Sequence, residues 1–154
     1  MKIKELKKVP NLEHNKRLSR AYAQFDQLLA ELRTKSLPED IIAYINNDLV
    51  QINAVDGKEK QLLKHVRATQ ASILKQLEFK LKLVTKNHYR NLWLALGMAA
   101  IGLPIGVAFG LSFGNMGYLA IGVPIGMGIG LVIGRRLDKK ALEEGNQLDI
   151  EVTY

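Results

Sequence analysis

The chain of 154 residues is long enough for about one domain, and its charge is distributed very unevenly. The first 91 residues carry 18 Lys/Arg and 10 Asp/Glu, the 43 residues from Leu92 to Gly134 carry no charge, and the remainder has a net charge of −1. The absence of cysteine excludes disulfides, thiolate nucleophiles and cysteine-ligated metal sites. The basic character therefore belongs to the first part of the chain, and the long neutral block needs its own explanation.

The basic part has the apolar spacing of helices. Apolar residues recur at intervals of three and four in residues 12–35. A second helix is expected after Ser36, with Leu37–Asp40 as its first turn, and a third from near Lys58. No Pro or Gly separates this third helix from the neutral block, so we expect it to continue into the block as a stalk. The N-terminus lacks the apolar core of a signal peptide, and residues 1–91 are predicted to form a three-helix cytoplasmic domain.

The neutral block has the length and composition of a membrane hairpin. A helix needs about 20 apolar residues to cross a bilayer, so 43 residues suffice for two spans. The spans are predicted at 92–113 and 118–134, with a turn at 114–117 and a cytoplasmic tail at 135–154. A flexible linker would carry serine and other polar residues. The pattern around Gly128–Gly134 lacks the strand, helix and acidic residue of a dinucleotide-binding fingerprint.

Basic residues flank the block on both sides, while its central turn has none. Cytoplasmic flanks of membrane spans are rich in Lys and Arg, so both termini are predicted to be cytoplasmic. Lys80, Lys82 and Lys86 are expected to attract anionic lipid. The residues expected at the membrane interface are Tyr89, Arg90, Trp93, Arg135 and Arg136.

The block is an internal duplication with a period of 20 residues. In each copy glycine recurs at every fourth position, which places the glycines on one helix face where backbones can approach closely. Three uses of these faces remain open: packing of the spans on each other, packing combined with homo-oligomerisation, and pore lining. Pro104 and Pro124 occupy equivalent positions and are expected to break the helices. The glycines predicted to mediate helix packing or oligomerisation are Gly102, Gly106, Gly110, Gly114, Gly122, Gly126, Gly130 and Gly134.

No group of residues suggests catalysis. His14, His65 and His88 are far apart and have no ligand partners at helical spacing, so neither a metal site nor a cofactor site is predicted. The basic helices carry no nucleic-acid recognition motif, which disfavours a nucleic-acid partner. We therefore expect a protein that is not an enzyme.

The segment YRNLWLALGMAAIGLPIGVAFG, with GNMGYLAIGVPIGMGIGLVIGRRLDKKALEEGNQLD after it, resembles a group of uncharacterised small bacterial membrane proteins with a doubled glycine-zipper transmembrane hairpin. The resemblance covers roughly residues 80–150. It implies a multi-pass protein of the bacterial cytoplasmic (inner) membrane and no established activity.

The predicted fold class is an all-α membrane protein: a helical cytoplasmic domain followed by a two-helix glycine-zipper transmembrane hairpin. The predicted function is that of a self-associating scaffold or anchor whose helical domain engages a cytoplasmic protein partner. The alternative is an oligomeric pore or membrane-perturbing effector formed by the glycine-zipper hairpins.

Overall fold

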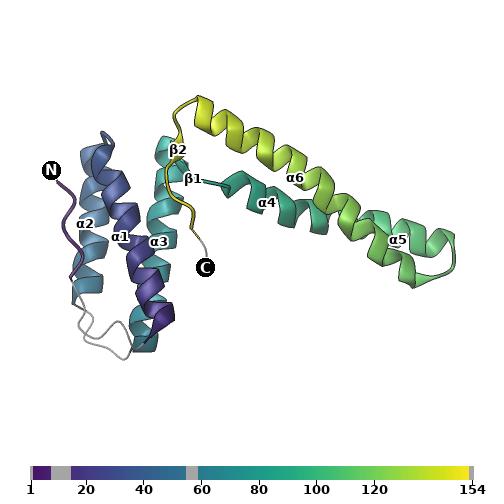
Figure 1. Cartoon of the computed structure of the whole chain (residues 1–154), viewed down its shortest axis with the longest axis horizontal. Helices are drawn as coiled ribbons and strands as arrows, with labels where there is room; N and C mark the ends of the chain where they lie inside the picture. The colour runs from purple at the N-terminus through teal and green to yellow at the C-terminus, as the bar shows by residue number, and fades with distance from the viewer. Residues whose placement is uncertain (1, 8–14, 55–58, 153–154) are drawn as a thin grey trace. The chain divides into compact units, whose positions relative to one another are not determined.

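The computed structural model describes residues 2–7, 15–54 and 59–152, most of which are helical (Figure 1). The chain divides into two compact units. The helical unit comprises Met1–Val84 and Leu148–Tyr154, and the hairpin unit comprises Thr85–Gln147. Two-residue strands, β1 (Val84–Thr85) and β2 (Gln147–Leu148), pair where the chain passes between the units. The helices are α1 (Lys16–Thr34), α2 (Glu39–Asn53), α3 (Glu59–Leu81), α4 (His88–Leu96), α5 (Leu103–Ser112) and α6 (Leu119–Glu143), with a π-helix η2 (Gly97–Gly102) and a 3₁₀ turn η3 (Met116–Tyr118).

The helical unit is a bundle in which α3 packs against both α1 and α2. Helix α1 begins after Asn15, whose side-chain oxygen accepts hydrogen bonds from the backbone N–H groups of Arg17 and Leu18 at 3.2 Å. The predicted start near residue 12 falls in residues 8–14, outside the described part. Helix α2 begins at Glu39 after Pro38 and has no side-chain cap, so it starts two residues later than the predicted first turn at Leu37.

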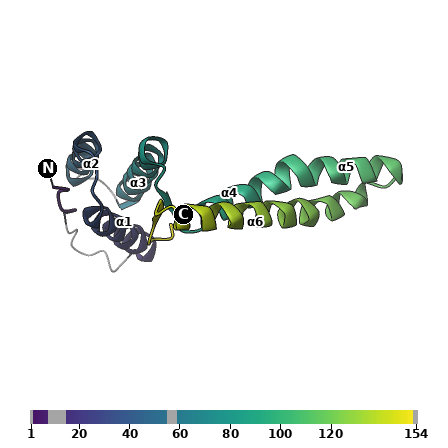
Figure 2. The same ribbon diagram turned by 90° about the horizontal axis from the view of Figure 1, so that it is seen from above.

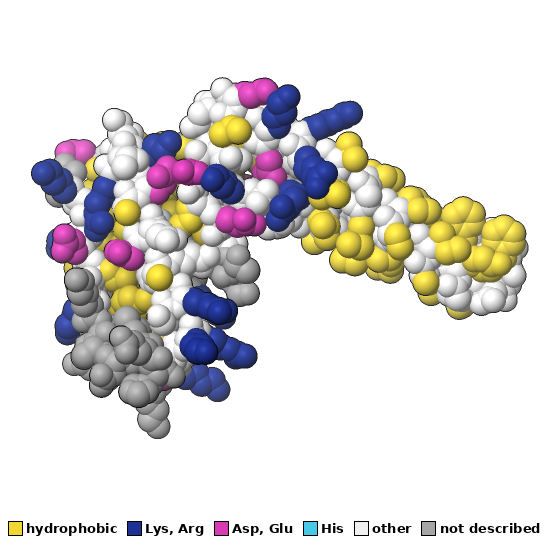
Figure 3. All heavy atoms as spheres, viewed as in Figure 1, with side chains coloured by type: hydrophobic (Ala, Val, Ile, Leu, Met, Phe, Trp, Pro, Cys, Tyr) yellow, Lys and Arg dark blue, Asp and Glu magenta, His cyan; other side chains and the backbone are white. Residues whose placement is uncertain are grey.

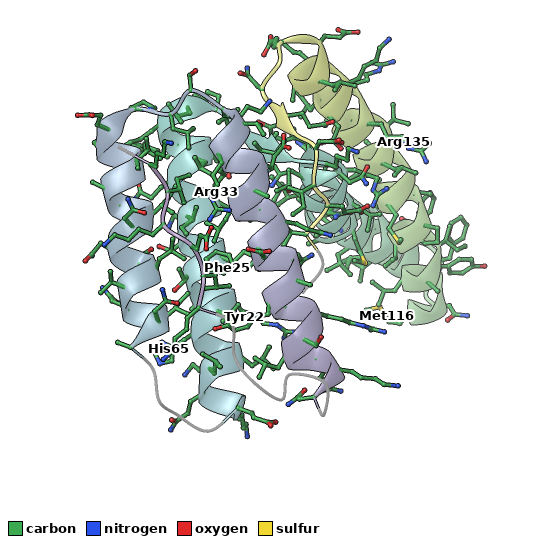
Figure 4. The ribbon with its side chains drawn as sticks, turned by 60° about the vertical axis from the view of Figure 1, so that its left-hand side comes forward. Tyr22, Phe25, Arg33, His65, Met116 and Arg135 are labelled. Atoms are coloured by element: carbon green, nitrogen blue, oxygen red, sulfur yellow. The ribbon has the colours of Figure 1, made fainter. Side chains whose placement is uncertain are left out.

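The three helices bury one apolar face each, with the spacing predicted from the sequence. Figure 4 labels Tyr22 and Phe25 on α1, and Phe25 is completely buried. Such a face stabilises a helix because its burial removes apolar surface from water. The fully buried side chains of the core include Phe25, Leu28, Leu29, Leu32, Ile45, Leu49, Val66, Ile73 and Leu77.

Helix α3 does not continue into the hairpin unit as a stalk, because it ends at Leu81. Lys82 adopts a left-handed backbone (φ 57°), and its N–H donates to the carbonyl of Glu78. The N–H of Leu83 donates to the carbonyl of Leu77 at 3.3 Å. The bond from Lys82 to Glu78 is that of the αL motif, which ends many helices and usually has glycine at the left-handed position.

The C-terminal residues return to the helical unit. Leu148 is completely buried and Ile150 is 6% exposed, and both belong to the core of the bundle. The backbone N–H of Asp149 donates to the carboxylate of Glu31 at 3.2 Å. The prediction of a separate tail at 135–154 therefore differs from the structure. Residues 135–147 belong to the hairpin unit and residues 148–154 to the helical unit, which makes the hairpin an insertion into a discontinuous bundle.

Replacing Leu148 by Ala is expected to lower the free energy of unfolding of the helical unit by about 2–5 kcal/mol, because it leaves a cavity in the core. Hydrogen exchange of the α1 and α3 amides in the detergent-solubilised full chain measures the effect. Leu142→Ala is the control, since Leu142 is 62% exposed. Equal protection in the two variants would contradict the placement of Leu148 in the core.

Candidate functional site

The hairpin unit consists of two long legs that lie side by side (Figures 1 and 2). The first leg is the run His88–Ser112, and the second is the run Met116–Glu143. Both are long and apolar enough to cross a membrane by length and composition. Only 22% and 17% of their most apolar stretches are buried within the chain, whereas the core helix of a water-soluble protein is mostly buried.

The legs meet through glycine backbones. A Cβ atom added at Gly126 would lie within 3.0 Å of backbone atoms of Gly97 and Gly102, and one added at Gly122 within 3.0 Å of Gly102 and Gly106. Real Cβ atoms essentially never approach so closely. The two backbones therefore pack directly on each other, as helices do in lipid when small residues line their contact.

The predicted glycines are not all equivalent. Gly110 lies near the sulfur of Met116, and Gly114 lies in the turn with a left-handed backbone (φ 64°) and no neighbour within 4 Å of an added Cβ. Gly128 likewise has open space around it. The glycines whose added Cβ would clash with the facing leg are Gly97, Gly102, Gly106, Gly122, Gly126, Gly130 and Gly134.

Gly97 belongs to this contact although the four-residue spacing does not predict it. It precedes Gly102 by five residues, which would rotate it off the glycine face of a regular α-helix. The intervening segment Gly97–Gly102 is a π-helix, in which each turn holds an extra residue and bonds join residues five apart. The π-helix thus returns Gly97 to the same face.

The two prolines do not break the legs. Pro104 lies in the first turn of α5, directly after the π-helix, where the N–H of Leu103 donates to the carbonyl of Met98. Pro104 has no N–H to donate to the preceding turn, and the change from π-helical to α-helical bonding falls directly before it. Pro124 lies inside α6, which continues to Glu143. The predicted helix breaks are therefore absent at both positions.

Asp138 continues the inner face of α6. It follows Gly134 by four residues and is 9% exposed. Its two carboxylate oxygens accept hydrogen bonds from the backbone N–H groups of Tyr89 and Arg90, each at 2.9 Å. These groups lie in the first turn of α4, whose own cap residue Asn87 makes no side-chain hydrogen bond. A carboxylate from the second leg therefore caps the first leg and complements the positive end of its dipole.

At the opposite end, the turn between the legs is held by Asn115 and bordered by aromatic rings. The side-chain oxygen of Asn115 accepts a hydrogen bond from the N–H of Gly117 at 2.8 Å. The ring of Phe113 stacks on Phe109 at 6.1 Å and contacts Tyr118 at 5.1 Å between centroids. Aromatic rings therefore lie at both ends of the hairpin, with Trp93 and Tyr89 at the end where the hairpin begins.

The predicted lipid-binding lysines are divided between the two units. Lys80 makes a charge-assisted hydrogen bond with Asp40 inside the helical unit, and this bond holds the pKa of Asp40 below its ordinary value. Lys82 also belongs to the helical unit, whereas Lys86 belongs to the hairpin unit. At the predicted interface, Arg90 and Tyr89 lie directly against Gly134, so the basic residues Arg90 and Arg135 are at the same level of the hairpin.

The described residues offer little for catalysis. Within residues 2–7, 15–54 and 59–152, no three His, Asp or Glu side chains lie together so that they could hold a metal ion. Burial raises the pKa of Tyr22 and of Asp48, but neither residue lines the cavity of about 440 Å³ beside the N-terminal segment. That cavity is bordered by the side chains of Lys2, Ile3, Glu5, Leu32, Arg33, Lys35, Leu37 and Ile42.

No family model, curated protein or solved structure matches the chain. The functional argument therefore depends on the hairpin itself.

Replacing Gly126 by Ala is expected to separate the legs by about 1 Å, because the added methyl needs ordinary contact distance from the facing backbone. Spin labels on exposed positions Leu96 and Ile129, in a chain that has no native cysteine, report the distance between the legs in detergent or liposomes. Gly128→Ala adds the same methyl where nothing lies within 4 Å and is expected to leave the distance unchanged. An unchanged distance in the Gly126 variant would show that the legs are not packed as described.

Proposed function

We propose that the hairpin unit spans a membrane twice and anchors the helical unit to it. The observation that supports this most strongly is the apolar outer surface of the legs (Figure 3). Water-soluble monomers rarely expose a large continuous apolar patch. Large apolar side chains that are at least 40% exposed on this unit include Leu103, Val107, Phe109, Leu111, Phe113, Ile121, Ile125, Ile129 and Val132.

The dimensions of the legs agree with a bilayer. The charge-free part of the first leg, from Leu92 to Ser112, is about 31 Å long as a helix, and the hydrocarbon core is about 30 Å thick. The charge-free part of the second, from Tyr118 to Gly134, is about 25 Å long. The arginines that follow it have long side chains that reach the headgroups from a slightly buried backbone.

The connectivity supports an even number of crossings. Leu77 before the hairpin and Leu148 after it are buried in one core, so both ends of the hairpin are attached to the same folded unit. A single crossing would place these ends on opposite sides of the membrane. The basic residues at both ends favour the cytoplasmic side. Together with the resemblance to bacterial hairpin proteins, this leads us to place the protein in the bacterial cytoplasmic membrane with both termini inside.

The role we propose is that of a non-enzymatic anchor, without a cofactor, whose helical unit engages a cytoplasmic protein partner. Within this proposal the glycine face acts as a zipper between the two legs of one chain. Because the glycine faces of the two legs already pack against each other, a self-associating scaffold would form through the outer faces of the hairpin. An oligomeric pore would need the same outer faces, and the charge-free parts of the legs offer no Asp, Glu, Lys, Arg or His side chain to a conducted ion.

Single cysteines at Asn115 and Lys64 test the topology. In intact cells a membrane-impermeant maleimide is expected to label Asn115→Cys and not Lys64→Cys, since the turn lies outside and the helical unit inside. Labelling of both or neither from one side would contradict two crossings.

Ion flux from liposomes separates the anchor from the pore. We expect no flux above that of empty liposomes, together with capture of a cytoplasmic protein by the full chain that is lost when the helical unit is deleted. Flux that requires the hairpin would favour the pore.

A further inference from the structure

The basic residues at the end of α6 differ in whether their charge is compensated. Lys139 lies 3.6 Å from the carboxylate of Glu143, and Lys140 lies 3.7 Å from that of Glu144. One turn earlier, Arg135 and Arg136 are both exposed, and neither makes a hydrogen bond or ion pair with any residue in the described part of the chain. The uncompensated positive charge of this helix therefore lies at the arginines, of which Arg135 is labelled in Figure 4.

The arginines also lie at the boundary of the apolar surface. They directly follow Gly134, the last residue of the charge-free block. Gly134 packs against the backbone of Arg90, so the charged boundary of the second leg coincides with that of the first. Charge and apolar surface thus change at one level on both legs.

A continuous outer face of α6 runs from this boundary toward the turn. Arg136 lies on the same face as Val132 and Ile129, four and seven residues earlier. Val132 is 52% exposed and Ile129 is 40% exposed, and the neighbouring Gly128 leaves open space beside them. The face therefore presents a cation at one end and a shallow apolar surface along the rest, which matches a molecule with an anionic headgroup and an acyl chain.

We propose that Arg135 and Arg136 bind the phosphate of an anionic phospholipid whose acyl chain lies along Val132 and Ile129. The guanidinium group suits this role because it holds phosphate through two parallel hydrogen bonds. This inference depends on the proposed membrane insertion. It replaces the lysines predicted from the sequence, of which Lys80 is already engaged by Asp40, with the two arginines. Each cation near a membrane surface strengthens the attraction of anionic lipid by about fivefold.

The test compares two double variants with the same change in charge. The full chain is reconstituted into nanodiscs of mixed phosphatidylcholine and phosphatidylglycerol, and native mass spectrometry measures which lipids it retains. The unmodified chain is expected to retain phosphatidylglycerol above its share of the bilayer. Arg135→Gln with Arg136→Gln is expected to reduce this enrichment at least fivefold. Lys139→Gln with Lys140→Gln is expected to retain most of it.

Enrichment that is absent from the unmodified chain, or lost equally in both double variants, would overturn the proposal. A second measurement separates that result from a failure of membrane insertion. Trp93 is the single tryptophan of the chain, and phosphatidylcholine with brominated acyl chains quenches its fluorescence if the hairpin lies in the bilayer. Quenching without enrichment would reject the lipid site alone, whereas no quenching would reject the insertion on which it depends.

Discussion

The hairpin unit depends on the direct contact of two helix backbones. At Gly102, Gly122 and Gly126 no side chain separates the legs, and an added Cβ would overlap the facing backbone. In lipid the hydrophobic effect gives little drive for helices to associate, because apolar side chains gain little when they exchange contact with lipid tails for contact with one another. The close approach of the backbones supplies dispersion contacts instead. At the charged end of the hairpin, the carboxylate of Asp138 joins the two legs by accepting hydrogen bonds from backbone N–H groups of α4.

The proposed role as an anchor depends on the connectivity of the helical unit. Its core is built from α1, α2 and α3 and is completed by Leu148 and Ile150, which follow the hairpin in sequence. Both legs are therefore tied to one folded unit through segments that belong to its core. In the membrane arrangement that we propose, the two covalent connections of the hairpin would hold the bundle on one side of the bilayer.

Local sequence signals predicted the parts of the structure that are decided locally. The helices follow the three- and four-residue apolar spacing, and α6 ends at Glu143, two residues before Gly145, a glycine with a left-handed backbone (φ 72°). The end of α3 was missed because Lys82 takes the same left-handed conformation without being glycine. Gly97 was not predicted because its contact depends on a π-helix. A five-residue gap in a four-residue glycine pattern is not enough to predict a π-helix.

The remaining differences are contacts between distant parts of the chain. Asp138 extends the four-residue series that ends at Gly130 and Gly134. Its role as a cap can be predicted only if the start of α4 is known to face it. The sequence predicted only a tail at 135–154, yet the burial of Leu148 and Ile150 depends on contact with helices that precede the hairpin. Neither contact has a signature within one local window.

The central claim is that the neutral block lies in hydrocarbon as two closely packed legs. Single spin labels at Ile121, Ile125 and Ile129, together with labels at Asn115 and Lys139, test it in liposomes through their accessibility to oxygen and to a water-soluble nickel chelate. The account predicts that oxygen reaches the three isoleucine positions and the chelate does not, while the chelate reaches Asn115 and Lys139. Access of the chelate to Ile125, midway along α6, would contradict it.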